Sequence, residues 1–270
     1  MRYTMKSLLL SSLLLLGTAT TQSNAATLKG DTDINIAISN ELSEIREMIE
    51  LYVAIGIKLK YKDPAKRLQK DIDHFDKLID RLKSNCKDTN IIPDILATEA
   101  SWLKIKDHVK SALTAQDKDI MKKEILFVHS NLFKIKKGLI KTKKSLQPET
   151  DNETKKAIMA CTVIGSASRT FSAHYYMDMW KLKDPTISEH WKTAAKKYQA
   201  SIDTLNNSKF AKDAKFKKMI AKSSKHLKVF TMLWQLKSDN NYTPALITRK
   251  SKASHHNAME MEKIILGLSK

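Results

Sequence analysis

The chain contains little glycine and little proline, with six and five residues among 270. A protein built from β-hairpins needs more of both, because these residues supply the backbone angles of tight turns. Apolar residues recur instead at intervals of three and four along nearly the whole chain, which is the period of an amphipathic α-helix. The sequence therefore predicts an all-α protein.

Several catalytic and cofactor signatures are also missing. The chain has no Cys-x-x-Cys-His for haem attachment, no HExxH pair and no glycine-rich phosphate loop. No nucleophile lies in a recognisable arrangement with a general base. His255 and His256 are adjacent and point about 100° apart on a helix, so they fit a surface pair, and a lone histidine such as His174 is usually structural. The sequence thus predicts no enzyme, no cofactor and no metal site.

Only one long apolar run is present, and it lies at the start. Arg2 and Lys6 accompany apolar residues 7–16, and Ser23-Asn24-Ala25 supplies the small residues that a signal peptidase reads. We expect residues 1–25 to be a secretory signal peptide cleaved after Ala25; a retained anchor is the alternative, which the shortness of the run disfavours. The expected mature protein is soluble, periplasmic or secreted, and carries no transmembrane segment or output module.

Acidic residues are in the minority: 29 Asp and Glu face 48 Lys and Arg, and the formal net charge is +19. Lysines spread along helical faces are typical of a solvated surface. The same charge attracts anions, from small oxyanions to cell-envelope polymers. Nucleic acid is the weakest partner in this class, because no recognised binding motif accompanies the charge.

There are only two cysteines, Cys86 and Cys161. In an exported chain they could form one disulfide between the two halves. Cys161 also fits the apolar face of its predicted helix, as a buried free thiol. The residues alone leave both alternatives open.

The two halves of the chain resemble each other. Tyr61-Lys62-Asp63-Pro64 corresponds to Leu182-Lys183-Asp184-Pro185, and Ile79-Asp80-Arg81-Leu82 corresponds to Ile202-Asp203-Thr204-Leu205. A repeat of about 120 residues is too long for a solenoid unit and indicates a duplicated domain. We place the boundary in the polar joint 147–152, which gives repeats at 26–148 and 149–270.

Each half contains four predicted amphipathic helices. In the first half they lie at about 33–60, from Pro64 onwards, at 92–113 and at 118–146. In the second half they lie at about 153–182, from Pro185 onwards, at 210–237 and towards Ile264 and Leu268. Asp63 and Asp184 are the expected caps of the helices that begin at the following prolines. Short joints between such helices favour antiparallel packing. The predicted fold is two tandem antiparallel four-helix bundles related by internal duplication.

One side of the predicted helix 153–182 is made of small and hydroxylated residues around Arg169, which suits close approach by another helix. An unpaired guanidinium in such a seam is very costly, and no acid lies within reach on the same face. An anion bound by two parallel hydrogen bonds would supply the missing charge, with Ser172 as a further donor. The alternatives are a carboxylate from another helix, or an exposed arginine.

The segment Gly165-Ser166-Ala167-Ser168-Arg169-Thr170-Phe171-Ser172-Ala173 resembles a motif in the periplasmic helix of NarX/NarQ-type nitrate sensor kinases. It is also similar to the N-terminal domain of type IV pilus methyl-accepting chemotaxis transducers (PilJ-type). Gly165, Ser166, Arg169 and Ser172 match, whereas Ala167 and Thr170 replace an arginine and a methionine. The resemblance implies an exported four-helix bundle in which paired motif helices share one anion, contacted by Arg169.

Arg46 aligns with Arg169 in the first half. If the first and fifth helices meet at a pseudo-two-fold seam, the two arginines face each other there. Glu50 lies one turn after Arg46 and offers the alternative of a surface ion pair. The predicted ligand-binding residues are therefore Arg169, Ser172, Ser166 and Arg46.

These patterns lead to two hypotheses for function. The first is an exported soluble sensor-like protein that binds a small anion, nitrate or nitrite by the resemblance, or another small ligand, and acts through a membrane receptor or transducer. The second is a structural or adhesive envelope protein whose lysine-rich surface binds anionic polymers. In that case the strip of small residues serves as a bundle or homodimer seam.

Overall fold

The computed structural model describes residues 30–59, 62–237 and 242–268. Every regular element in these ranges is helical, so the all-α prediction is confirmed. The elements are α1 (Thr32–Gly56), α2 (Pro64–Asn85), α3 (Ile92–Lys110), η1 (Ser111–Leu113), α4 (Lys118–Leu146), α5 (Asn152–Met179), α6 (Thr186–Asn206), η2 (Lys209–Lys212), α7 (Ala214–Leu236) and α8 (Pro244–Ile265). The expected signal peptide lies outside the described residues. None of the described helices combines the length and apolarity needed to cross a bilayer.

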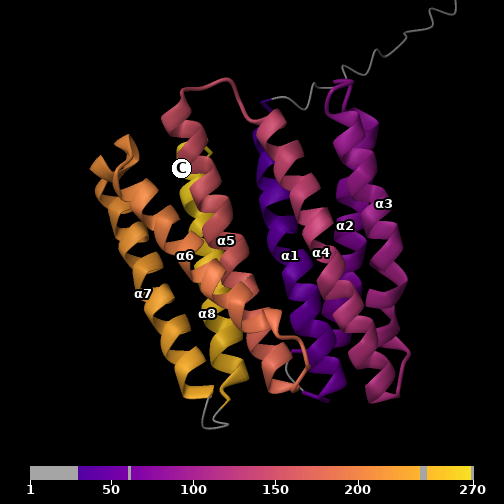
Figure 1. Cartoon of the computed structure of the whole chain (residues 1–270). Coiled ribbons are helices and arrows are strands. Elements are labelled where there is room, and N and C mark those ends of the chain that lie inside the picture. The colour runs from indigo at the N-terminus through magenta and orange to yellow at the C-terminus, as the bar shows by residue number, and fades with distance from the viewer. Residues whose placement is uncertain (1–29, 60–61, 238–241, 269–270) are drawn as a thin grey trace, which may run out of the picture.

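The helices stand side by side, and each runs antiparallel to the one before it in the chain (Figure 1). As a result α1 and α5 run in the same direction, and they pack directly against each other. Helix α5 lies at the centre, with its main contacts to α8, α1 and α6. The seam between α1 and α5 joins the groups α1–α4 and α5–α8 through one continuous hydrophobic core.

Aspartate side chains cap several helices, and the cap predicted at Asp63 is confirmed. Asp63 Oδ1 accepts a hydrogen bond from the Lys66 amide (3.1 Å), and Pro64 is the first helical residue of α2. Asp151 does the same at α5, through the amide of Thr154 at 2.8 Å. These caps pair amides that have no carbonyl partner within the helix.

The start of α6 departs from this expectation. The helix begins at Thr186, so Pro185 precedes the first helical residue. Asp184 Oδ1 accepts from the Thr186 amide (2.8 Å) and from its hydroxyl (2.6 Å), and Asp184 Oδ2 lies 3.0 Å from His129 Nδ1 on α4. The carboxylate is thus shared between the helix start and another helix, a contact that the local sequence does not reveal.

Two helices end earlier than predicted. Helix α1 stops at Gly56, and the amide of Leu59 bonds to the carbonyl of Ala54 (2.8 Å) across Lys58, whose φ is 57°. Helix α5 ends the same way around Lys181, whose φ is 55°. Both are left-handed C-terminal motifs, which glycine normally signals, so a lysine in that position hides them from the sequence.

Helix α8 was predicted only towards its end, because residues 248–257 are strongly polar. The structure shows this stretch as helix, with Thr248, Ser251, Ser254 and Asn257 buried. Three of these side chains find partners inside the protein: Thr248 donates to Glu50 Oε1 (2.7 Å), the Ser254 and Tyr198 hydroxyls lie 2.7 Å apart, and the Asn257 amide donates to the Met219 carbonyl (2.9 Å). Buried polar residues are tolerated where such partners exist.

Cys86 and Cys161 are both free thiols and both buried. The disulfide alternative is therefore wrong. The two helix groups are instead joined by a fully buried ion pair, in which Lys143 Nζ on α4 lies 2.5 Å from Glu262 Oε1 on α8. Lys143 also donates to the carbonyl of Asn35 and the hydroxyl of Ser39 on α1, each at 2.7 Å.

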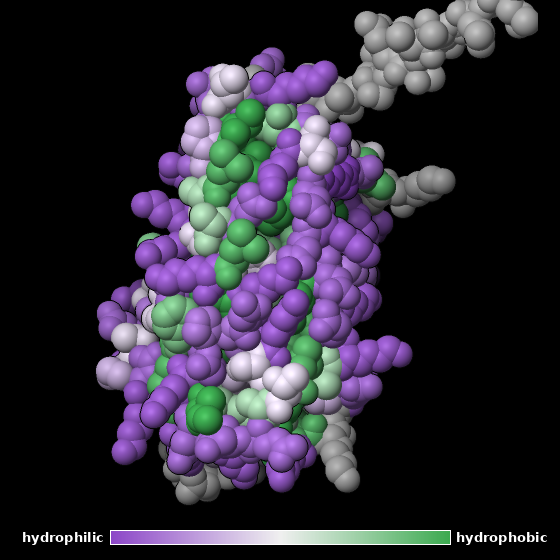
Figure 2. Space-filling view, turned by 90° about the vertical axis from the view of Figure 1, so that its right-hand side faces the viewer, coloured by the Kyte–Doolittle hydropathy of each residue, from purple (hydrophilic) through white to green (hydrophobic). Residues whose placement is uncertain are grey.

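The face on the α3 side is mainly hydrophilic, with hydrophobic side chains in a narrow line along the molecule (Figure 2). The exposed large hydrophobic residues of α3 and α4 are Leu96, Leu103, Ile120 and Phe133, at 48%, 59%, 52% and 67%. Nothing in the structure shows what would cover them.

Candidate functional site

The strip of small residues on α5 is buried, as predicted for a helix seam. Every residue from Gly165 to Met177 is buried. A Cβ added to Gly165 would lie 3.5 Å from the Ser43 hydroxyl of α1 and 3.0 Å from His255 Nδ1 of α8. Both neighbouring helices therefore approach this position closely.

Arg169 lies in this seam, but the expectation that no protein carboxylate balances it is wrong. Its Nη2 atom is 2.6 Å from Glu47 Oε2 on α1, and both side chains are about 7% exposed. Glu47 also pairs with Arg67 of α2 and, at 3.2 Å, with Lys252 of α8. The sequence could not show this acid, because it comes from another helix whose facing side depends on the tertiary packing.

The hydroxyl groups expected around the anion are placed differently. Ser172 Oγ donates to Glu50 Oε2 at 2.5 Å, and Thr248 donates to Glu50 Oε1 at 2.7 Å. Ser166 Oγ is buried and has no hydrogen-bond partner in the described part of the chain. The Nε and Nη1 atoms of Arg169 are also buried without a hydrogen-bond partner among the described residues, but Glu47 and Glu50 offset its charge. The predicted Arg46–Glu50 surface pair is also wrong, because Glu50 faces α5 and α8.

Arg46 itself is the arginine without an acid. It projects from α1 towards α4 and α5, where its charge acts on His129 and His174. Its Nε atom is buried without a hydrogen-bond partner, and no ion pair among the described residues includes it. Burial lowers its pKa to about 10, because the charged form has lost its hydration. The structure thus assigns the unbalanced guanidinium to the first half of the chain.

Lys136 on α4 is a second half-buried cation near Arg46. Burial lowers its pKa to about 7, and the charges of Arg46 and Lys197 add to the effect. No carboxylate within ion-pair distance of Lys136 is found in the part of the chain that the structure describes. Arg46 and Lys136 are both half-buried, and two neighbouring cations that are partly withdrawn from water usually have an acid nearby.

Three histidines meet beside these cations: His129 on α4, His174 on α5 and His190 on α6. One ring nitrogen of each lies within 4.8 Å of the others. The Nε2 atoms of His129 and His174 are 3.1 Å apart, and His129 Nδ1 donates to Asp184. Burial first, and then neighbouring positive charges, lower the pKa of His129 to about 4 and that of His174 well below its ordinary value. Both imidazoles are therefore neutral at pH 7.

Sequence reasoning missed this cluster because its members share no local motif. One signal was available for two of them. His174 lies about one turn before the end of α5 and His190 about one turn after the start of α6, so the α5–α6 hairpin brings them to the same height. The position of His129 depends on how α4 packs across α1 and α5, which periodicity alone does not determine.

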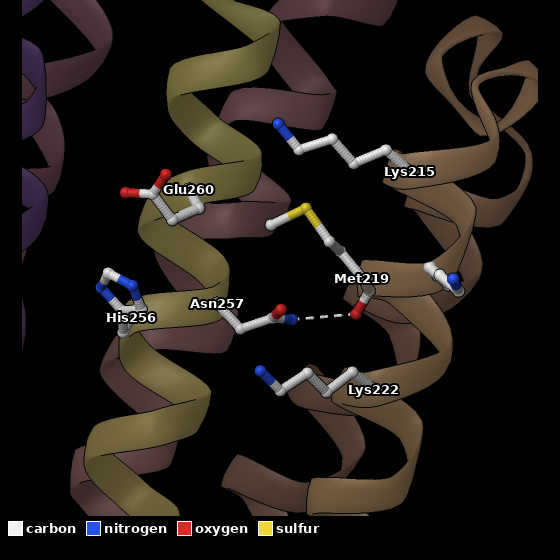
Figure 3. Close-up of a pocket in the computed structure, with 7 residues that line it drawn as sticks. Lys215, Met219, Lys222, His256, Asn257 and Glu260 are labelled. Carbon is white, nitrogen blue, oxygen red and sulfur yellow. Dashed lines mark hydrogen bonds between the residues drawn. The ribbon is translucent and has the colours of Figure 1, made fainter. Parts of the chain in front are cut away.

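A second candidate is the pocket of about 350 Å³ between α7 and α8 (Figure 3). Its lining includes Lys215 and Lys222, whose side chains extend across the opening, and Glu260 on the facing helix. The lysines are exposed and solvated, and Glu260 is paired with Lys263 at 2.8 Å. The pocket therefore lacks the half-buried, unbalanced charge found around Arg46.

No family model, curated protein or solved structure matches this chain. The resemblance to nitrate sensors and pilus-type transducers therefore rests on the short motif around Arg169. Function has to be inferred from the site itself.

Proposed function

We propose that this chain is an exported sensor-like binding protein for a small anion. The anion binds between α1, α4, α5 and α6, in contact with Arg46 and Lys136. The observation that supports this most strongly is that Arg46 has a buried unpartnered Nε and, unlike Arg169, no ion pair among the described residues. Leaving a buried donor without a partner costs about 1–3 kcal/mol. A bound anion removes that cost and adds charge-assisted hydrogen bonds.

The chemistry of the site favours a small planar oxyanion. A guanidinium presents parallel N–H groups in one plane, which match two oxygens of nitrate or nitrite. Lys136 adds a point charge from α4 when it is protonated. Since His129 and His174 are neutral at pH 7, they add no charge to that of Arg46 and Lys136. Nitrate and nitrite are also the ligands that the sequence resemblance suggests.

We further propose that the halves 26–148 and 149–270 arose by duplication. Arg46 and Arg169 lie on parallel helices in contact, and Lys58 and Lys181, at the same spacing, occupy equivalent left-handed positions. Under this correspondence Thr170 takes the place of Glu47. The second half thus has no acid to offer Arg46, whereas Glu47 neutralises Arg169. One ancestral anion site would then remain open and the other would have become a structural ion pair.

In this proposal residues 1–25 direct export, and the mature protein transmits its ligand state to a membrane receptor or transducer. The central position of α5 supports such a role. It contacts helices of both groups, so a ligand that draws α1 and α4 towards α5 and α6 would change the spacing between the groups. That change is the signal a partner would detect.

Isothermal titration of the tag-free protein with nitrate, in the presence of a chelator, tests the proposal. We expect one saturable site that is lost in Arg46→Met and retained in the matched control Arg81→Met. Arg81 is suitable because it is exposed and its carboxylate partner Asp31 is 3.5 Å away. Equal loss in both variants would contradict the proposal. So would binding to anionic glycans that vanishes with salt and ignores Arg46, which supports the envelope-polymer alternative.

A further inference from the structure

The three histidines beside Arg46 have the arrangement of a metal-ligand set. They come from three helices, α4, α5 and α6, so their relative positions are fixed by helix packing and not by a mobile loop. The His129 side chain is 3% exposed and the residue His174 is 1% exposed, so both are buried. His190 is exposed and lies on the solvent side. An ion could therefore enter past His190 and be held by two rigid ligands.

The distances fit a single ion. Two imidazole nitrogens bound to tetrahedral Zn²⁺ at 2.0–2.1 Å lie about 3.3 Å apart. The Nε2 atoms of His129 and His174 are separated by 3.1 Å, and the nitrogen of His190 is within 4.8 Å of both. His190 is the exposed member of the cluster, so it is the ring that would move to complete a three-nitrogen face. Without an ion, one of the two close Nε2 atoms must donate its proton to the other.

Asp184 supplies the support that metal-bound histidines usually have. Its Oδ2 atom accepts from His129 Nδ1 at 3.0 Å, which places the proton on Nδ1 and leaves the Nε2 lone pair directed at His174. This carboxylate–histidine contact fixes both the tautomer and the ring orientation of a ligand. It also accounts for the position of Asp184 outside the start of α6.

The charge of the surroundings determines what else must bind. Arg46 and Lys136 lie close enough to lower the pKa of His174, and they oppose a bare divalent cation. An anion in the open fourth position would balance both the ion and these side chains. Imidazole nitrogens suit Zn²⁺, Cu²⁺ and Ni²⁺, whereas Mg²⁺ and Ca²⁺ require oxygen ligands.

We propose that His129, His174 and His190 bind one divalent transition-metal ion of the Zn²⁺ type, with the anion next to Arg46 as its fourth ligand. The metal site goes beyond the proposed function. Only the identity of the fourth ligand depends on that function. His129 and His174 form the buried part of the site, and His190 closes it on the solvent side. Asp184 is a positioning residue that acts through His129.

Titration of the tag-free, metal-stripped full chain with Co²⁺, followed by visible absorption, tests the site. We expect one equivalent to produce the intense bands of four-coordinate Co²⁺, displaced by one equivalent of Zn²⁺. His129→Gln and His190→Gln should abolish the bands, and Asp184→Asn should weaken affinity roughly 10–100-fold. The double variant His255→Gln/His256→Gln is the control and should bind normally. Circular dichroism of each variant confirms folding.

The outcomes separate this inference from the proposed function. Absence of the bands, or bands that persist in both His129→Gln and His190→Gln, would overturn the metal site whatever nitrate does. Arg46→Met should bind Co²⁺ more tightly than wild type in anion-poor buffer, because it removes a repelling charge. Weaker Co²⁺ binding by that variant would contradict the charge argument. Nitrate binding in chelator, measured separately, tests the anion site alone.

Discussion

Glu47 is the residue on which the seam between the helix groups depends most. A single buried carboxylate contacts Arg169, Arg67 and Lys252, which come from three different helices. Removing one member of a buried ion network leaves the other charges without compensation. The same side chain explains why Arg169 is structural while Arg46 remains available to a ligand.

Glu47→Gln should therefore lower the free energy of unfolding by about 3–5 kcal/mol, as measured by urea denaturation. Glu99→Gln is the control, because Glu99 pairs with Lys83 near the surface and such pairs contribute about 0–1 kcal/mol. Similar losses of unfolding free energy in the two variants would show that Glu47 does not hold a buried ion network.

Lys136 should make anion binding depend on pH. Its pKa is lowered to about 7, so it is mostly charged at pH 6 and mostly neutral at pH 8. Nitrate should bind up to roughly tenfold more tightly at pH 6 than at pH 8, and Lys136→Met should remove this difference. A pH profile unchanged by the substitution would contradict this role.

The same shift has a consequence for stability without ligand. A lysine whose pKa is lower in the folded state than in the unfolded state binds fewer protons when folded between about pH 7 and its ordinary value of 10.5. Its contribution to stability therefore rises with pH across that window. Lys136→Met should flatten this part of the unfolding free energy against pH, as measured by urea denaturation at several pH values. An unchanged slope would mean that Lys136 is solvated.

At the scale of elements, the buried pair Lys143–Glu262 connects α4 with α8, and Lys143 also contacts α1. Lys143→Met should cost about 3–5 kcal/mol in urea denaturation, because it leaves Glu262 buried and unpaired. The neighbouring Lys144 is exposed, so Lys144→Met should change stability by less than about 0.5 kcal/mol. The double variant Lys143→Met/Glu262→Leu should recover part of the loss; no recovery would point to packing as the cause.

The helices were largely predictable, and their junctions were not. The bounds predicted for α4 agree with the structure because its apolar period is unbroken. The ends of α1 and α5 were missed because Lys58 and Lys181 occupy positions typical of glycine. Most of α8 was missed because its buried side is polar, and such a side is stable only with partners from other helices.

The candidate site was predictable only in its residue types. The sequence predicts that Arg169 lacks an acid and offers Glu50 as a partner for Arg46, and the structure contradicts both expectations. Which of the two is neutralised depends on Glu47 reaching across the seam, which is a property of packing. The histidine cluster required the positions of three helices relative to one another.

At the scale of the whole molecule, the α1–α5 seam makes the two helix groups interdependent. The core is continuous across it, so we expect the groups to unfold in one transition. Trp102 on α3 reports on the first group, and Trp191 and Trp234, stacked with ring centroids 4.0 Å apart, report on the second. Two variants, one retaining only Trp102 and the other only Trp191 and Trp234, should show urea transitions at the same midpoint by fluorescence. Two separated transitions would show that the halves are independent domains.

The central claim is that an anion occupies the space beside Arg46 and Lys136. The most direct measurement is a crystal structure of the protein with bromide, located by anomalous scattering. The account predicts a bromide peak within hydrogen-bond distance of the Arg46 guanidinium and absent from crystals of Arg46→Met. Bromide found only on exposed lysines, or Arg46 already held by a protein carboxylate, would contradict it.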